Sequence, residues 1–167
     1  MREPLTYEQA NHLQRAMRRL GASRPGSWLF ARALHRIDRP VYRLTRGRHT
    51  LASLVSGLPV VMLTTTGARS GLPRTVPVLG LPTPDGIVVI ASNYGQERDP
   101  AWYHNLRARP EGHVTVDGVA RAFRATEAEG DARARIWQQA TEVYPGMSQY
   151  ERRASNRTIA MLVLETD

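Results

Sequence analysis

Two arginines and a serine lie in a glycine-bounded segment, Gly67 to Arg74, and these residues are well placed to bind an anion. The segment reads Gly-Ala-Arg-Ser-Gly-Leu-Pro-Arg, so Arg69, Ser70 and Arg74 lie on or beside a tight turn. Exposed backbone N–H groups in such a turn, with a guanidinium on either side, form a concavity that suits phosphate or carboxylate. The spacing is not that of a P-loop, and the chain contains no lysine. A solvated loop with no ligand fits the same pattern, so both interpretations stand.

A second polar segment, residues 92–95, reads Ser-Asn-Tyr-Gly and precedes a predicted helix whose first residues are 101–106. Small polar side chains at a strand end can hydrogen-bond the edge of a flat heterocycle, and the first amides of a helix can face a phosphate. Trp102 and Leu106 are four residues apart and share one face of that helix, which is typical of packing into a core. We therefore expect Trp102 to be a core residue.

Residue content disfavours several kinds of chemistry. The chain has no cysteine, which excludes disulfides, thiolate nucleophiles and Cys-ligated metal sites. Its five histidines show no metal-ligand spacing, so no metal site is predicted. Ser70 and Ser92 have no identifiable base, and no paired acids share a motif, so hydrolysis has no support. If the chain is an enzyme, a bound cofactor is expected to supply the reactivity.

Six strands are predicted to position these segments. They are assigned to residues 59–66, 74–81, 86–92, 113–116, 119–126 and 159–164 from β-branched apolar runs bounded by turn residues. Asp117-Gly118 is the strongest hairpin signal among the turns. Strands grouped as meanders, with helices between them, predict an α+β barrel rather than a doubly wound parallel sheet.

The predicted helices cover residues 6–20, 28–37, 100–109 and about 126–144, with a further helical turn at 148–154. Asp99 is expected to be the N-cap acceptor of the third helix, with Pro100 at its first position. Thr126-Glu127-Ala128-Glu129 matches the capping-box pattern and is expected to open the fourth helix. Pro145-Gly146 is expected to end that helix after Tyr144.

The first fifty residues carry the whole positive excess of the chain. They contain eleven arginines and three acids, and the formal net charge of the full chain is +8. In the helix at 6–20, Leu13 and Leu20 belong to the predicted buried face and Arg18 to the exposed face. Such basic amphipathic helices can dock on the rest of the domain, which we favour, or lie along an anionic membrane. We divide the chain into a basic amphipathic helical segment, 1–50, and a cofactor-binding barrel domain, 51–167.

Taken in order, these motifs resemble the deazaflavin (coenzyme F420)-dependent nitroreductase and quinone reductase family of actinobacteria. The resemblance covers about two thirds of the chain and rests on the strand at 60–66, the turn at 67–74, Val76-Pro77, Ala91-Ser92, residues 99–106, Tyr144-Pro145 and Arg157-Thr158. It implies a flavin-type split β-barrel of about six mostly antiparallel strands with flanking helices. It also implies that reduced F420 passes a hydride to an electron-poor acceptor such as a quinone, an enone-type metabolite or a nitro compound.

The resemblance further implies roles for individual residues. Those expected to bind the cofactor are Ala68, Arg69, Ser70, Arg74, Thr75, Val76, Pro77, Val78, Leu79, Ile90, Ala91, Ser92, Asn93, Ala101, Trp102, Tyr103, His104 and Asn105. Tyr144, Met147 and Tyr150 are expected to line the substrate pocket. Ser92 or Tyr144 is the candidate catalytic residue, donating a proton or hydrogen bond to the substrate.

Three positions depart from the pattern of the family. Arg69 and Asn93 occur where some relatives have lysine, so one charge near the phosphate is absent at Asn93. Met147 occurs where the nitroimidazole-reducing members have an aromatic residue. Reduction of nitro compounds is therefore in doubt, whereas cofactor binding is not.

The main alternative is a split-barrel protein that binds haem, a flavin or a fatty acyl ligand without F420 turnover, because a fold alone does not decide function. A nucleic-acid partner is not expected, since the arginines alternate with apolar helix positions and no nucleic-acid motif is present. We expect a cytoplasmic protein whose partner is a small-molecule hydride acceptor. Contact of residues 1–50 with the inner face of the cell membrane, homodimer formation, the natural acceptor and the direction of the reaction in the cell are left open.

Overall fold

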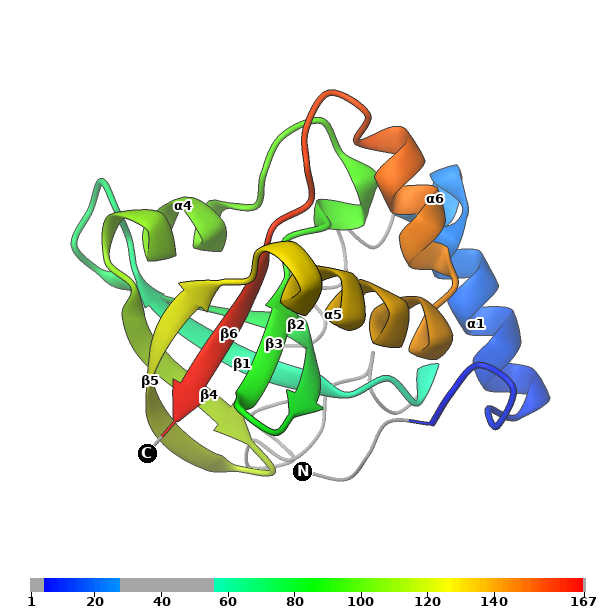
Figure 1. Ribbon diagram of the computed structural model, residues 1–167, viewed down its shortest axis with the longest axis horizontal. Helices are drawn as coiled ribbons and strands as arrows, with labels where there is room; N and C mark the ends of the chain where they lie inside the picture. The colour runs from blue at the N-terminus through cyan, green and yellow to red at the C-terminus, as the bar shows by residue number, and fades with distance from the viewer. Residues whose placement is uncertain (1–4, 28–55, 167) are drawn as a thin grey trace.

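The computed structural model describes residues 5–27 and 56–166 of the chain. Within them, six strands close into one barrel in the order β1-β2-β3-β6-β5-β4, and every neighbouring pair is antiparallel. The strands are β1 (Val60–Thr66), β2 (Pro73–Thr83), β3 (Gly86–Ile90), β4 (Glu111–Val116), β5 (Val119–Glu127) and β6 (Met161–Thr166). The helices are α1 (His12–Ala22), α4 (Ala101–Ala108), α5 (Gly130–Val143) and α6 (Gly146–Arg153), with a 3-10 turn η1 (Asn93–Gly95). The predicted α+β split barrel with flanking helices is confirmed (Figure 1).

Two hydrophobic clusters hold the barrel, one inside it and one on the outer face of β2, β3 and β6. Val88 and Val89 are adjacent in β3 and both are completely buried, because Val89 points into the inner cluster and Val88 into the outer one. Burial on both faces explains why β3 reads as a continuous apolar run. Trp102 of α4 belongs to the inner cluster, as expected, while α5 and α6 supply the outer one (Figure 1).

The β4–β5 hairpin forms as its sequence predicts. Asp117 and Gly118 have φ angles of 51° and 83°, and Val116 pairs directly with Val119. Two positive φ angles in a two-residue loop are those of a type I′ turn, whose twist matches that of the flanking strands.

The predicted start of α4 is wrong by one residue. The helix begins at Ala101 with Pro100 as its N-cap, and no side chain caps it. The carboxylate of Asp99, the expected acceptor, instead lies 2.7 Å from Nη1 of Arg157. The carboxylate thus pairs with a guanidinium in a charge-assisted hydrogen bond, and this contact across the fold replaces the local one.

The capping box predicted at the start of α5 is also wrong. Thr126 and Glu127 are still in β5, where they pair with Val163 and Leu162 of β6. The helix begins three residues later at Gly130, and no side-chain hydrogen bond caps it. Sheet pairing satisfies the backbone groups that the capping box would have served.

The first helix faces the opposite way from the prediction. Leu13 and Leu20 are 65% and 46% exposed, whereas Arg18 is 2% exposed. The Arg18 guanidinium donates to the backbone carbonyls of Ser56 at 2.9 Å and Val143 at 2.8 Å. Burial lowers the pKa of Arg18, and these carbonyls offset the cost of burying its charge. The helix lies beside α6 (Figure 1).

The helix predicted over residues 28–37 and the boundary placed at residue 50 lie outside the described residues. Among the described helices, none is both long enough and apolar enough to span a bilayer.

Candidate cofactor and substrate site

The β1–β2 turn is fixed against α4 by one amide side chain. Asn105 is 8% exposed, and its Oδ1 accepts a hydrogen bond from the backbone N–H of Ala68 at 2.9 Å. Its Nδ2 donates to the hydroxyl of Thr65, also at 2.9 Å. Two predicted cofactor residues, Ala68 and Asn105, are thus brought together. Because both ends of the amide are engaged within the protein, Asn105 positions the turn.

The turn presents free cationic and N–H groups to its surroundings. Arg69 and Arg74 are exposed and form no ion pair with any described residue. The backbone N–H groups of Arg69 and Ser70 also have no acceptor in the described part of the chain. A Cβ added at the buried Gly67 would lie 2.6 Å from Oγ of Ser70 and 3.2 Å from the carbonyl oxygen of Leu72, so glycine allows the turn to fold this tightly. The result is a compact concavity with a guanidinium on each side, which suits an anion.

Strand β2 presents its predicted cofactor residues alternately to two sides. Val76 and Val78 pack into the inner cluster, whereas Leu79 packs against the outer one. Thr75 is exposed and Pro77 is half-buried. Beyond Arg74, the outward residues Thr75, Pro77 and Leu79 are the ones whose side chains can face a ligand outside the barrel.

Arg157 holds the end of β3, and sequence reasoning gave it no role. Its guanidinium donates to the carbonyl oxygens of Ala91 at 3.1 Å, Ser92 at 3.0 Å and Gln96 at 3.1 Å. The same side chain forms the ion pair with Asp99, and the two side chains are 10% and 24% exposed. Arg157 thereby ties the strand end to the start of α4. Arg157 is part of a motif that resembles the family, and that motif is the sequence signal that could have pointed to it. Its role could not be read locally, because its partners are about 60 residues away along the chain.

The residues that follow β3 adopt unusual backbone conformations. Asn93, Tyr94 and Gly95 have φ angles of 45°, 57° and 75°, all in the left-handed region. A left-handed conformation costs a non-glycine residue about 1–3 kcal/mol and is often found near functional sites. Nδ2 of Asn93 donates to the carbonyl oxygen of Arg98 at 2.8 Å, so this predicted cofactor side chain closes its own loop.

Ser92 is the better placed of the two candidate hydrogen-bond donors. It is half-buried, its carbonyl oxygen is held by Arg157, and its hydroxyl forms no hydrogen bond with any described residue. The neighbouring residues are less accessible. Ile90 packs into the outer cluster and Ala91 into the inner one.

The predicted cofactor residues of α4 divide between core and surface. Trp102 and Tyr103 are 7% and 8% exposed and pack into the inner cluster, while Ala101 and His104 are exposed. The Tyr103 hydroxyl donates to a carboxylate oxygen of Glu127 at 3.0 Å, and desolvation raises the pKa of the phenol. Ala101 and His104 are therefore the residues of this group that can meet a ligand through their side chains.

The three residues expected to line a substrate pocket are packed in the outer cluster. Tyr144, Met147 and Tyr150 are 5%, 3% and 4% exposed. The Tyr150 hydroxyl donates to the carbonyl oxygen of Gly21 at 2.8 Å, so the Tyr144 hydroxyl, 2.9 Å away, donates to Tyr150. Burial raises the pKa of both phenols. In this structure the Tyr144 proton is held within the outer cluster, and a role of Tyr144 as proton donor to substrate stays a prediction.

Comparison with known proteins identifies relatives of this architecture. A sequence model of the family described as F420H(2)-dependent quinone reductase matches residues 34–166. A Mycobacterium tuberculosis protein named as an F420H(2)-dependent quinone reductase is 32% identical over 87 residues, covering 52% of this chain and 73% of that protein. A second quinone reductase of that name from M. tuberculosis is 37% identical over 84 residues, covering 50% of this chain and 55% of the relative.

Solved structures similar to this chain include an F420-dependent reductase. An F420-H2 dependent reductase, FDR-A, is 33% identical with a TM-score of 0.59, covering 64% of this chain and 94% of that one. A structure described as a domain-swapped dimer is 30% identical with a TM-score of 0.61, covering 84% of this chain and 99% of that one. The heme storage protein HutZ of Vibrio cholerae, 12% identical with a TM-score of 0.50, covers 78% of this chain and 90% of that one and shares the fold alone.

Proposed function

The chain belongs to the F420H(2)-dependent quinone reductase family, and from that premise we propose that it transfers a hydride from reduced coenzyme F420 to an electron-poor organic acceptor of the quinone type. The observation that carries the proposal is the β1–β2 turn. Its two guanidinium groups and two backbone N–H groups lack partners among the described residues, and Asn105 holds the turn against α4. A cofactor with an anionic tail fits this arrangement.

We assign the tail of F420 to Arg69, Ser70 and Arg74 and its ring to the strand end at Ser92. When bound, F420 supplies a two-electron hydride. The outward residues of β2, namely Thr75, Pro77 and Leu79, are the side chains that can line the space outside the barrel. Asn105 fixes Ala68 in the turn. The remaining predicted cofactor residues belong to or pack against the inner cluster, and their role is to support the barrel: Val76, Val78, Ala91, Trp102 and Tyr103.

Ser92 is proposed to hydrogen-bond the charge that develops on the ring or the acceptor. Its hydroxyl is free to donate, and Arg157 fixes the backbone on which it stands. A donor held in place before the reaction stabilises developing charge without reorganisation. We assign no nucleophile, because hydride transfer needs positioning and exclusion of water rather than a covalent step.

Quinones are the acceptor class that the family favours, and enone-type metabolites and nitro compounds are secondary candidates. Met147 lies in the packed outer cluster and offers no aromatic surface for stacking. We therefore expect nitro compounds to be poor acceptors relative to quinones.

The rival function is a split-barrel protein that binds haem, a flavin or a fatty acyl ligand without F420 turnover. Titrating the protein into F420 and following the fluorescence of the deazaflavin separates the two, since the rival predicts no saturable change. Arg74→Gln is expected to weaken F420 binding at least tenfold. Arg121→Gln, an exposed arginine on β5, is the matched control and is expected to leave it unchanged.

The division of the chain, its location, its contact with the membrane and its oligomeric state are also proposed. We assign residues 1–50 as the basic segment and 51–167 as the cofactor-binding domain of a cytoplasmic enzyme. Leu13 and Leu20 on the exposed face of α1 are candidates for peripheral contact with the membrane. A homodimer is supported by the neighbour described as a domain-swapped dimer. Gel filtration and vesicle sedimentation test these two properties separately.

A further inference from the structure

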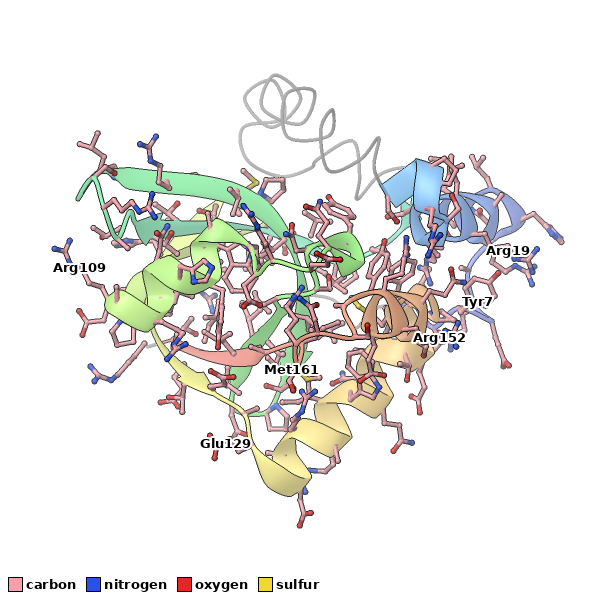
Figure 2. All side chains as sticks on the ribbon, turned by 90° about the horizontal axis from the view of Figure 1, so that it is seen from above. Tyr7, Arg19, Arg109, Glu129, Arg152 and Met161 are labelled. Atoms are coloured by element: carbon pink, nitrogen blue, oxygen red, sulfur yellow. The ribbon has the colours of Figure 1, made fainter. Side chains whose placement is uncertain are left out.

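A groove of about 590 Å³ lies beside η1 and the end of α6. Its walls come from Arg24, just after α1, from residues 95–98 at and after the end of η1, and from residues at the end of α6. They carry four arginines, Arg24, Arg98, Arg152 and Arg153, and one acid, Glu97. Figure 2 labels Arg152 on α6, next to α1. This groove is separate from the β1–β2 turn, whose arginines do not line it.

One of the four arginines is structural. The Arg153 guanidinium donates to the carbonyl oxygens of Ala22 at 2.6 Å and Gln149 at 3.2 Å and to the hydroxyl of Ser27 at 3.1 Å. It also lies over the ring of Tyr150, 5.0 Å from the centroid. Arg153 therefore joins α6 to the end of the N-terminal helical region and builds one wall of the groove.

The other three arginines are free to bind a ligand. Arg24, Arg98 and Arg152 are exposed, and none forms a hydrogen bond through its side chain or an ion pair within residues 5–27 and 56–166. The position of Arg152 at the C-terminal end of α6 is accounted for by the helix dipole. Arg24 and Arg98 are not on that helix, so the dipole does not account for their convergence on the same groove.

The wall that carries Arg98 is held rigidly. Gly95 packs so closely on α6 that an added Cβ would lie 2.9 Å from Cα of Tyr150. Nδ2 of Asn156 donates to the carbonyl oxygen of Glu97 at 3.2 Å, and Arg157 binds the carbonyl of Gln96. The backbone of this loop is therefore fixed before any ligand binds, which reduces the ordering cost of binding.

We propose that this groove is an anion-binding site for a ligand that carries two or more negative charges as carboxylate or phosphate groups. Three unpaired guanidinium groups against one carboxylate leave an excess of positive charge at the groove, and guanidinium groups bind carboxylate and phosphate through paired N–H donors. The groove begins at Gly95, three residues after Ser92 along the chain, and we include in the proposal that the bound anion is part of a molecule beside the strand end. The anion can come from an acidic acceptor, from the distal tail of the cofactor or from a free metabolite. In each case the arginines of the groove would bind carboxylate or phosphate groups.

The test uses inorganic tripolyphosphate as the probe and the full chain as the protein. Isothermal titration is expected to show binding that weakens with salt, and Arg98→Gln/Arg152→Gln is expected to weaken it at least tenfold. Arg121→Gln/Arg135→Gln removes the same charge from exposed positions on β5 and α5 and is expected to change it less than twofold. Glu97→Gln is expected to strengthen binding. Equal weakening in the two double variants, or no binding by the wild type, would overturn the proposal.

Kinetics with two acceptors identify the source of the anion. If the acceptor supplies it, Arg98→Gln/Arg152→Gln raises the KM of a carboxylated quinone and not that of a neutral one. If the cofactor tail supplies it, the same variant weakens F420 binding whichever quinone is used. If a free metabolite supplies it, only tripolyphosphate binding falls. Because the probe titration needs no turnover, it can fail while the proposed reductase activity stands, and the converse also holds.

Discussion

Removing Arg157 is expected to damage both the stability of the fold and the cofactor site. The variant Arg157→Met keeps much of the side-chain volume but leaves the Asp99 carboxylate, 24% exposed, without its partner at 2.7 Å. Breaking a largely buried ion pair from one side costs about 3–5 kcal/mol. We expect the lower half of that range, because Asp99 keeps some access to water. Urea unfolding followed by circular dichroism measures the loss.

The double variant Asp99→Asn/Arg157→Met separates the ion pair from the three carbonyls that Arg157 also binds. Removing the unpaired carboxylate should recover about 1–3 kcal/mol relative to Arg157→Met, as expected for directly coupled residues. Arg157→Lys keeps the charge but lacks the planar guanidinium with its several N–H donors. It should therefore restore the ion pair with Asp99 but only some of the hydrogen bonds to the carbonyl oxygens at the strand end.

The functional readout distinguishes a positioning role from a merely structural one. A displacement of about 1 Å at a reacting centre can cost roughly 100-fold in rate. Assayed well below its unfolding temperature, Arg157→Met is therefore expected to lose kcat/KM and F420 affinity together, and Arg157→Lys to recover part of both. Unchanged F420 affinity and kcat/KM in a destabilised but folded Arg157→Met would refute the positioning role. An unchanged free energy of unfolding would refute the energetic reasoning as well.

Three further predictions address other parts of the structure. Asn105→Ala leaves the buried Thr65 hydroxyl and the partly buried N–H of Ala68 without this partner and is expected to cost about 1–3 kcal/mol in urea unfolding, with weaker F420 binding; wild-type F420 affinity would contradict its role in setting the turn. Arg74→Gln should lower F420 affinity with an unchanged melting temperature, whereas a fall in melting temperature matching the loss of affinity would point to a structural residue. Because burial raises the pKa of Tyr144 and Tyr150, their stabilising effect is complete below about pH 10, where tyrosine ionises in the unfolded chain, and is lost as the pH rises further. The melting temperature should accordingly fall steeply above pH 10, and Tyr144→Phe should reduce that fall; an unchanged slope in Tyr144→Phe would argue against a buried phenol.

The strands were predictable because their signals are local. The β-branched run at 60–66 and the Asp117-Gly118 turn specify their own conformations through side-chain sterics and the φ angles of the turn. The capping predictions at Asp99 and Thr126 failed for the opposite reason. Each of these residues found a partner or a strand neighbour from a distant part of the chain, and that contact replaced the local one.

The arginines show most clearly what sequence reasoning could not supply. Arg18, with its side chain buried against backbone carbonyls, and Arg157, inside the fold beside Asp99, look no different in the sequence from the exposed Arg69 and Arg74. Carbonyl oxygens that lack partners determine where an arginine is buried, and the closed barrel determines where those oxygens lie. The buried tyrosines follow the same rule, because the hydroxyl of Tyr150 is bound by a carbonyl of α1.

Single-turnover oxidation of reduced F420 by a soluble neutral quinone tests the proposed reductase activity most directly. With enzyme in excess, oxidised F420 should appear in a one-to-one ratio with the quinone consumed. The rate should saturate with quinone concentration and fall sharply for Arg74→Gln but not for Arg121→Gln. If the wild type binds F420 saturably but does not accelerate its oxidation by any quinone, or if it does not bind F420, the proposed function is contradicted.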